Sequence, residues 1–412
     1  PVRFRSTVMG LIQRAEVVTA GPVLIIGTGL IGTSIALALR GSGVAVYLWD
    51  ASPTSLALAG DMGAGTPLSR GFQSFADVSD GSGLVVVASP PDVSGGIVAT
   101  CLKAFPRAVV TDVASVKEAV VGDVFASSTD LADEGEAAAT EYPGLTGSDL
   151  ARYVGSHPMA GRARSGASHA DGDLFIGRPW VIVPTEHSSP AAVTTVRNLA
   201  VDVGAVPMEL GPVEHDEAVA LVSHVPQLVS SLLAARLATA SSDALGLAGQ
   251  GLRDTTRIAA SDPGLWTAII AGNADRVAGI LVDLRDDLEG LISGLQAGGV
   301  QADGAIPPGV AGAIAKVMTA GNQGVERIPG KHGDSSRRWG YVEVLVPDEP
   351  GELGRLFSEL GSIGVNIEDL VLEHSAGQPV GLARLMIEPG VVEETQVELE
   401  ARGWRIASKS LR

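Results

Sequence analysis

The chain has 412 residues, of which 45% are hydrophobic and 18% are charged, and its formal net charge is −18. This length exceeds what one hydrophobic core serves, so two or three folded domains are expected. The acidic balance argues against a surface for nucleic acid or an anionic membrane, because such surfaces need clustered Lys and Arg. An anionic ligand must therefore be met by local positive groups.

Cysteine usage and the start of the chain indicate the compartment. The single cysteine, Cys101, cannot form an internal disulfide, and no run reaches about 18 uninterrupted apolar residues. Residues 1–20 carry charged side chains where a secretory signal has an apolar stretch. We interpret them as a leader and assign them no function. We expect a cytoplasmic protein with neither a membrane nor a nucleic-acid partner.

Strands alternate with helices in the first part of the chain. Short apolar runs lie at 23–26, 44–49, 84–88 and 108–111, and further strand candidates follow at 180–183 and 206–210. Strands separated by helix-length stretches form a parallel sheet covered on both faces. Residues 21–189 are therefore predicted to form an α/β Rossmann-type domain.

The pattern becomes helical from about residue 190. Long segments rich in Ala, Leu and Val are interrupted by turn signals at 241–243 and 261–264. We expect an all-α domain for dimerisation and substrate binding over 190–298, and a homodimer, because these helices carry more apolar surface than one small core hides. Residues 299–338, rich in Gly, Pro and Ser with a short helical patch at 310–319, are interpreted as a linker.

A glycine-rich motif directly follows the first predicted strand and opens a helix: Gly27-Thr28-Gly29-Leu30-Ile31-Gly32. Gly27 permits a tight turn, Gly29 lets the backbone approach a pyrophosphate, and Gly32 lets helix and strand pack closely. The helix N-terminus supplies positive charge for the phosphates. The motif predicts a dinucleotide site, and the alternative is a glycine-rich turn that binds nothing.

Asp50, at the end of the second predicted strand, indicates which dinucleotide binds. A carboxylate at this place accepts hydrogen bonds from a ribose 2′-hydroxyl and repels a 2′-phosphate. The prediction is NAD, with no metal ion. The alternative is that Asp50 is a solvated loop carboxylate.

Four longer motifs narrow the chemistry: DVASVK at 112–117, GSHPMAG at 155–161, SHVPQ at 223–227 and DTTRIA at 254–259. In this order they closely resemble the prephenate and arogenate dehydrogenase family, over about residues 22–295. The resemblance implies oxidation of the ring C4 alcohol of prephenate in L-tyrosine biosynthesis. Hydride passes to NAD, carbon dioxide leaves and 4-hydroxyphenylpyruvate forms. Arogenate, with an amino group in place of the keto group, is the alternative substrate.

Two residues are candidates for the chemical step. The reaction needs a group that accepts the hydroxyl proton, and neutral imidazole suits this, so His157 is predicted as the base, the alternative being a polar core or turn histidine. Ser115 follows a strand at the carboxyl edge of the predicted sheet. The resemblance implies that Ser115 hydrogen-bonds the substrate hydroxyl and orients His157. It could equally, or also, cap a helix that starts at Val116.

Substrate binding needs donors for the two carboxylates of prephenate, and the fork of an arginine suits a carboxylate. Arg257 matches the family's substrate-binding arginine, and its alternative is an exposed helix-surface side chain. His224 matches a family histidine at the substrate mouth, and its alternative is a buried helix histidine. His215 also matches a family position but is interpreted as structural.

One position departs from the family pattern. The motif after His157 usually has a glutamate where this chain has Ala163. In relatives this glutamate joins an ionic network at the site entrance, so we expect altered pH dependence or substrate access rather than loss of chemistry.

The last segment, 339–412, predicts the order strand-helix-strand-strand-helix-strand of a ferredoxin-like α+β unit. DEPGEL at 348–353 and GVNI at 364–367 make it resemble an ACT domain. The resemblance implies pairing, and an effector amino acid, expected to be tyrosine, where Gly351 and Asn366 meet. The alternative is a unit that only dimerises.

Two other functions remain open at this point. A β-hydroxyacid dehydrogenase would also join a Rossmann domain to a helical one, but its G-x-x-x-K helix motif is not found near Val222. A catalytically silent regulator that senses NAD and an amino acid is the alternative of another class. The set of His157, Ser115 and Arg257 argues against it.

Overall fold

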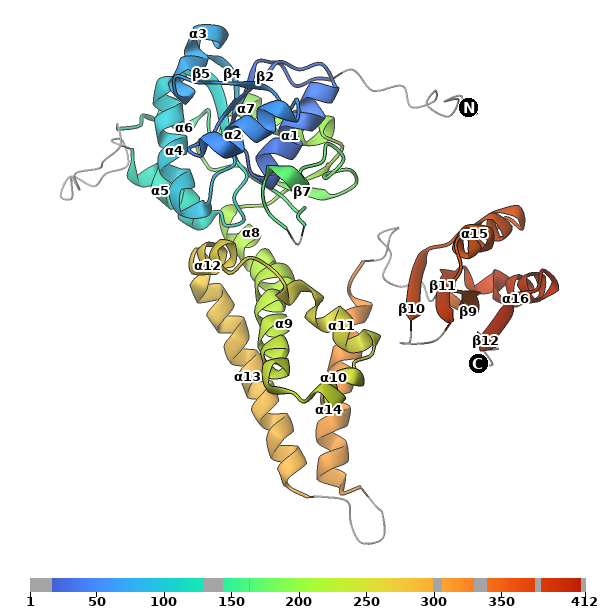
Figure 1. Cartoon of the computed structure of the whole chain (residues 1–412). Helices are drawn as coiled ribbons and strands as arrows, with labels where there is room; N and C mark the ends of the chain where they lie inside the picture. Colours follow the sequence, from blue (N-terminus) through green and yellow to red (C-terminus); the bar gives the residue numbers. More distant parts are fainter. Residues whose placement is uncertain are drawn as a thin grey trace, which may run out of the picture. The chain divides into compact units, whose positions relative to one another are not determined.

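The computed structural model describes residues 17–128, 144–162, 164–298, 306–329, 339–374 and 379–408 (Figure 1). The chain divides into two compact units, and each is considered by itself. The first unit contains the chain up to Leu233 together with Ile258–Val282. The second contains Ala234–Arg257 and the chain from Asp283 onward.

Five parallel strands form the central sheet of the first unit, in the order β3-β2-β1-β4-β5. They are β1 (Val23–Ile26), β2 (Val46–Trp49), β3 (Thr66–Pro67), β4 (Ser82–Val87) and β5 (Arg107–Asp112). This is the strand order of a dinucleotide-binding sheet. The four strands predicted here are confirmed within two residues at each end. The two residues of β3 are too few to produce a sequence pattern.

Helices cover both faces of this sheet (Figure 1). Val23 and Ile25 of β1 belong to the core shared with α1, whereas Leu24 and Ile26 belong to the core shared with α4. Successive strand residues point to opposite faces, so both faces are buried. The helices of this unit are α1 (Leu30–Gly41), α2 (Pro53–Asp61), α3 (Ala76–Ser79), α4 (Pro91–Ala104), α5 (Glu118–Ala126), α6 (Gly147–Leu150), α7 (Pro190–Asp202), α8 (Pro212–Val219), α9 (Val225–Ala235), which ends just beyond it, and α12 (Pro263–Ala271).

A second, three-stranded sheet carries the HPMAG motif. Strand β6 (Gly155–Pro158) pairs antiparallel with β7 (Pro179–Val183), which pairs parallel with β8 (Val206–Glu209). The sequence predicts β7 and β8 but not β6, because the residues of β6 show no apolar alternation. All four residues of β6 are nevertheless buried. His157 therefore lies on a paired strand, opposite Val181, and not in a turn.

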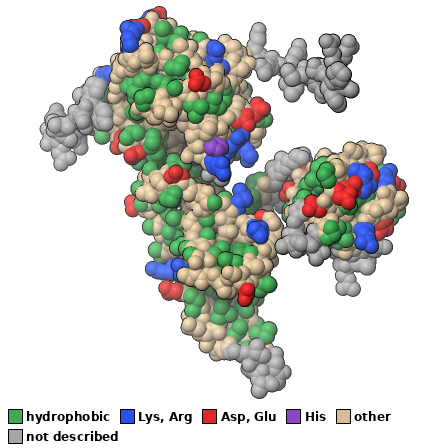
Figure 2. All heavy atoms as spheres, viewed as in Figure 1, with side chains coloured by type: hydrophobic (Ala, Val, Ile, Leu, Met, Phe, Trp, Pro, Cys, Tyr) green, Lys and Arg blue, Asp and Glu red, His purple; other side chains and the backbone are tan. Residues whose placement is uncertain are grey.

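One helical run, Pro212–Thr239, is long and apolar enough to cross a membrane by length and composition, and the bent pair Pro263–Ala271 and Ala274–Gln296 passes the same test. This test averages hydropathy over 18 residues, whereas the sequence criterion required about 18 uninterrupted apolar residues, and the sequence contains no such run. Core helices also pass such a test, and this run buries His215, Asp216 and His224. Hydrophobic side chains are nonetheless exposed on the helices, as Figure 2 shows.

The helical part of the second unit contains α10 (Ser242–Gly246), α11 (Gln250–Thr256), most of α13 (Ala274–Gln296) and α14 (Pro308–Glu326). Gly294 of α13 lies against Ala313 of α14 so closely that a side chain on Gly294 would collide with it. Helix α14 is 19 residues long, so the linker prediction is wrong for this segment. The glycines of α14 lower its helix propensity, and its packing against α13 at Gly294 overrides that propensity.

The C-terminal part of the second unit has a four-stranded antiparallel sheet in the order β10-β11-β9-β12. Its elements are β9 (Gly340–Pro347), α15 (Glu352–Ser362), β10 (Asp369–His374), β11 (Val380–Ile387), α16 (Val392–Ala401) and β12 (Arg405–Ser408). The predicted ferredoxin-like order is confirmed. It is readable from the sequence because β9 and β11 alternate and α15 is amphipathic.

Candidate functional site

The glycine motif forms the turn between β1 and α1, and its glycines have different surroundings. Gly27 has φ +97°, and a Cβ there would collide with the carbonyl of Ala88. A Cβ on Gly32 would collide with the carbonyl of Gly27. A Cβ on Gly29, in contrast, would meet nothing within 4 Å. Two glycines thus serve the fold, and Gly29 leaves open space at the N-terminus of α1, where a pyrophosphate can approach.

Asp50 is tied into this turn. Its Oδ2 accepts hydrogen bonds from the backbone N–H of Thr28 (2.6 Å) and from the Thr28 hydroxyl (2.9 Å), and its Oδ1 accepts one from the N–H of Ser52 (2.7 Å). A carboxylate has about four lone-pair sites, so about one is left for a ribose hydroxyl. Asp50 is therefore part of the turn and not a solvated loop group, and the turn fits NAD.

Two glycine substitutions separate binding from folding. Gly29→Ala should keep the Tm of the protein and weaken NAD binding at least about tenfold, or about 1.4 kcal/mol, because the new methyl group occupies the open space. Gly27→Ala should lower the Tm, because its φ and the Ala88 carbonyl exclude a side chain. Thermal unfolding and NAD titration measure both effects. Unchanged NAD affinity in a folded Gly29→Ala protein would contradict the assignment of this turn.

A chain of three buried side chains runs from β6 to α8. Nδ1 of His157 lies 2.8 Å from Nε2 of His215, and Nδ1 of His215 lies 2.7 Å from Oδ1 of Asp216. His215 and Asp216 are fully buried, and His157 is 9% exposed. Of the three side chains in this hydrogen-bonded series, only His157 retains some exposure to solvent.

The carboxylate of Asp216 also holds the beginning of α5. Its Oδ1 accepts a hydrogen bond from the N–H of Lys117 (2.8 Å), and its Oδ2 accepts one from the N–H of Glu118 (2.9 Å). These groups have no partner within the helix, and an acidic side chain at a helix N-terminus is favourable. Ser115 does not cap this helix, which begins at Glu118 after Lys117, so that alternative is wrong. Ser115 lies, partly exposed, in the loop between β5 and α5.

A buried ion pair lies under this loop. Nζ of Lys117 pairs with Asp112 and donates to the carbonyl of Ser156 (2.9 Å), and the Tyr153 hydroxyl donates to Oδ2 of Asp112 (2.8 Å). Both charged side chains are fully buried. Removal of one partner of such a pair costs about 3–5 kcal/mol, because the other charge is left uncompensated. The pair therefore fixes β5, the start of α5 and the strand that carries His157.

His224 is buried in the same unit, with only 1% of its surface exposed. Its Nδ1 lies 3.2 Å from Nδ2 of Asn273, and the same amide nitrogen donates to the carbonyl of Asp216 (2.7 Å). The ring also meets the edge of Trp266. His224 is thus a buried helix histidine, in agreement with its alternative interpretation, and Asn273 joins it to the His157 chain.

Burial lowers the pKa of all three histidines. The pKa of His157 is lowered well below its usual value, by burial first and then by His215, Lys117 and His224. Burial also lowers the pKa of His215, against the opposing effect of Asp216, and lowers the pKa of His224 to about 4. The rings are therefore neutral near pH 7.

Stability should depend on pH through these rings. In the unfolded chain they take up protons near pH 6.5, whereas in the folded protein they resist protonation, so the free energy of unfolding should fall as the pH drops below about 6.5. For His224 the loss continues to about pH 4. Denaturant unfolding at pH 7.5, 6.5 and 5.5 measures this.

Two matched variants test the origin of this effect. His224→Asn should reduce the change in the free energy of unfolding with pH, whereas His169→Gln, which lies outside this network, should leave that change as it is. A free energy of unfolding that stays constant from pH 7.5 to 5.5 would refute the expectation.

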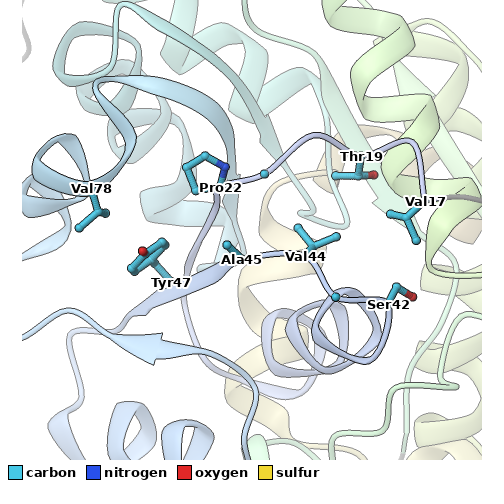
Figure 3. A pocket seen from close by; sticks show the side chains of 10 residues that line it. Val17, Thr19, Pro22, Ser42, Val44, Ala45, Tyr47 and Val78 are labelled. Carbon is cyan, nitrogen blue, oxygen red and sulfur yellow. The ribbon is translucent and has the colours of Figure 1, made fainter.

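One cavity in the described part of the chain lies away from this network. It measures about 490 Å³ and is lined mainly by residues that precede β1 and by those that lead into β2 and begin it, among them Val17, Pro22, Val44 and Tyr47 (Figure 3). It opens at the amino-terminal edge of the parallel sheet, whereas the glycine turn is at the carboxyl edge. Parallel sheets place their ligands at the carboxyl edge, so this cavity is not the cofactor site.

The remaining predicted residues belong to the second unit or are outside the described part. Arg257 is exposed and begins a short 3-10 helix, Arg257–Ala259. Gly351 precedes α15 with φ +97°, and Asn366 is exposed in the loop before β10. Ala163 lies outside the described residues.

Two family models match the chain: "Prephenate dehydrogenase, nucleotide-binding domain" over residues 35–132 and 142–209, and "Prephenate dehydrogenase, dimerization domain" over residues 211–301. A protein of Streptomyces niveus named "Probable prephenate dehydrogenase NovF" is 34% identical over 383 residues, which are 92% of this chain and 98% of that one. The chain belongs to the prephenate dehydrogenase family.

Solved structures of prephenate dehydrogenases agree with this assignment. The Aquifex aeolicus prephenate dehydrogenase in complex with hydroxyphenyl propionate and NAD+ aligns with a TM-score of 0.57 and 27% identity, over 73% of this chain and 97% of that chain. Synechocystis arogenate dehydrogenase aligns with a TM-score of 0.55 over 74% of this chain and 99% of that chain, and at 24% identity it shows the fold alone.

Sequence reasoning missed several members of the buried network. It does not single out Asp216, Lys117 or Asn273, and it assigns His215 only a structural role. The available signals are the adjacent His215 and Asp216 and the lysine at the end of DVASVK. Neither signal reveals that the residues meet, because Lys117 and Asp216 are 99 positions apart.

Proposed function

We infer that this protein is an NAD-dependent prephenate dehydrogenase, which oxidises and decarboxylates prephenate to 4-hydroxyphenylpyruvate in L-tyrosine biosynthesis. The observation that carries the proposal is the position of His157, at the end of a buried hydrogen-bonded series of side chains, in the same unit as a dinucleotide turn. Its domains are residues 21–189 for NAD, 190–298 for substrate and dimerisation, and 339–412 for regulation.

His157 is proposed to accept the proton of the C4 hydroxyl. A base must be neutral before it accepts a proton, and burial, which lowers its pKa, keeps His157 neutral. Ser115, in the partly exposed loop after β5, is proposed to hydrogen-bond the same hydroxyl. Residues 27–32 and Asp50 are proposed to hold NAD, which when bound accepts the hydride from the ring carbon.

Arg257 and His224 are proposed to bind the substrate. Arg257 is exposed and offers five N–H donors in a fork that matches a carboxylate. His224 is buried, so its role requires that a ring N–H reach the substrate from within the helical domain. Arogenate carries the same ring, so arogenate dehydrogenase is the alternative function.

The C-terminal unit is proposed to be an ACT domain that binds tyrosine near Gly351 and Asn366. Its ferredoxin-like topology and the positive φ of Gly351 support this. The family's dimerization domain and the exposed apolar side chains of α13 support a homodimer. The acidic composition of the chain argues against nucleic-acid and anionic-membrane partners, and a cytoplasmic location is proposed as well.

The role of His157 predicts a pH profile. As the pH falls, protonation of His157 removes the base, so kcat/KM for prephenate should fall on the acid side with an apparent pKa below 6.5. His157→Asn should lower kcat at least about 100-fold, because general base catalysis contributes about 10²–10⁴. Initial rates of NADH formation measure both. If the unmodified protein forms no NADH from prephenate or arogenate, the enzyme function is wrong. The alternative, a catalytically silent regulator that senses NAD and an amino acid, then remains.

Arg257 predicts a change in KM. Arg257→Ala should raise the KM for prephenate about 10- to 100-fold, because a charge-assisted hydrogen bond contributes about 1.5–3 kcal/mol. Arg253→Ala, which removes an exposed arginine of α11, is the matched control and should leave the KM unchanged. An equal effect of both substitutions would contradict the role of Arg257.

The same assay decides the substrate and the effector. The ratio of kcat/KM for prephenate to that for arogenate should favour prephenate, and both values should fall when L-tyrosine is present. A higher kcat/KM for arogenate would select the alternative function.

A further inference from the structure

We propose that Asp216 is a positioning residue that decides which ring nitrogen carries the hydrogen in two histidines at once. Through its carboxylate it leaves Nε2 of His157 as a bare acceptor, and through its backbone carbonyl it makes Nε2 of His224 a donor. The proposal rests on the proposed function only where it assigns a use to these two nitrogens.

The first branch follows from what each group can donate. Burial alone would raise the pKa of Asp216, but the hydrogen bonds from His215 and from the two backbone N–H groups hold this pKa below its usual range, so the carboxylate only accepts. His215 must therefore carry its hydrogen on Nδ1, which lies 2.7 Å from Oδ1 of Asp216. A neutral ring has one hydrogen, so Nε2 of His215 accepts.

The same reasoning continues one ring further. Nε2 of His215 lies 2.8 Å from Nδ1 of His157, and two acceptors cannot form a hydrogen bond. Nδ1 of His157 is therefore the donor. The hydrogen of the neutral His157 ring is used in this bond, and Nε2 keeps a free lone pair, which is the form a general base needs.

The second branch runs through Asn273. The carbonyl of Asp216 can only accept, so the amide group that lies 2.7 Å from it must be the NH2 group of Asn273. The flipped amide would set two oxygens against each other. The same nitrogen lies 3.2 Å from Nδ1 of His224, which must therefore accept. The neutral His224 ring carries its hydrogen on Nε2 and offers an N–H.

The charged groups around His157 support a proton acceptor that is neutral at rest. Lys117, His215 and His224 disfavour a positive ring and lower its pKa, and burial acts in the same direction. The negative charge of Asp216 lies beyond His215, as seen from His157, and the negative charge of Asp112 lies beside Lys117. After proton transfer, the positive charge on His157 is one hydrogen-bonded ring away from the Asp216 carboxylate.

Asp216 is well held for this task. Its two oxygens accept from the N–H groups of Lys117 and Glu118, so they cannot turn without breaking the start of α5. The chain His157–His215–Asp216 follows the logic of a serine-protease triad, in which the aspartate fixes the tautomer of the catalytic histidine. Here one additional ring lies between the carboxylate and the base.

The direct test is a neutron crystal structure of the full-length protein without substrate, near pH 7.5. We expect deuterium on Nδ1 of His157, on Nδ1 of His215 and on Nε2 of His224. Deuterium on Nε2 of His157 or on Nδ1 of His224 would overturn the proposal. This readout needs no activity, so it is separate from the test of the proposed function.

The kinetic test is Asp216→Asn, compared with Glu217→Gln, which removes one negative charge from the next, exposed position of α8. Asp216→Asn removes the negative charge behind His215 and sets an amide NH2 group against the N–H of Lys117 or Glu118. Where the NH2 group takes the place of Oδ1, it donates to His215 and reverses both tautomers. We expect kcat to fall at least about 100-fold with KM for prephenate and NAD within about threefold, and no change for Glu217→Gln. An Asp216→Asn protein with normal Tm and normal kcat would overturn the proposal.

A second pair keeps the test decisive if Asp216→Asn does not fold. His215→Gln retains a carbonyl that accepts from Nδ1 of His157, whereas His215→Leu retains no acceptor. His215→Gln should keep at least about tenfold more kcat than His215→Leu. Equal kcat in two folded variants would show that His215 is only structural. Inactivity of the unmodified protein on both substrates would instead refute the proposed function and leave the tautomers to the neutron structure.

Discussion

The carboxylate of Asp216 at the N-terminus of α5 is the interaction on which the rest of the site depends. It satisfies two backbone N–H groups that have no partner in the helix, and it orients His215 and through it His157. One buried charge therefore joins the parallel sheet, through the start of α5, to the first helix of the helical region. Loss of this charge would affect folding and chemistry together, and only isosteric replacements can separate the two effects.

The buried ion pair of Lys117 and Asp112 holds the same site in place. Buried charges are costly unless they are paired and fully hydrogen-bonded, and this pair is completed by Tyr153 and the carbonyl of Ser156. Since Ser156 precedes His157 on β6, the position of His157, the proposed base, is set by a paired strand and an ion pair. Such rigid support suits a proton acceptor, because proton transfer depends on distances within hydrogen-bond reach.

The sequence pattern predicts secondary structure correctly where interactions between residues close in sequence decide it. The C-terminal part of the second unit alternates polar and apolar residues along β9 and β11, and the order of its elements is predicted correctly. Strand β6 and helix α14 are not predicted at their observed extent, because neither sequence has strong propensity. Pairing with β7 makes β6 a strand, and α14 packs against α13, where Gly294 lets Ala313 approach closely.

The sequence by itself determined the dinucleotide turn and singled out Asp50 and His157 as candidates, because each depends on neighbours within a few residues or on a long motif. Only the tertiary structure decided that His224 is buried and that His157, His215, Asp216 and Asn273 form one network. His157 and His215 are 58 positions apart, and Asn273 is 57 positions from Asp216. Hydrogen-bond partners so far apart produce no pattern in the sequence. The protonation pattern of the site can therefore be inferred only from the three-dimensional structure.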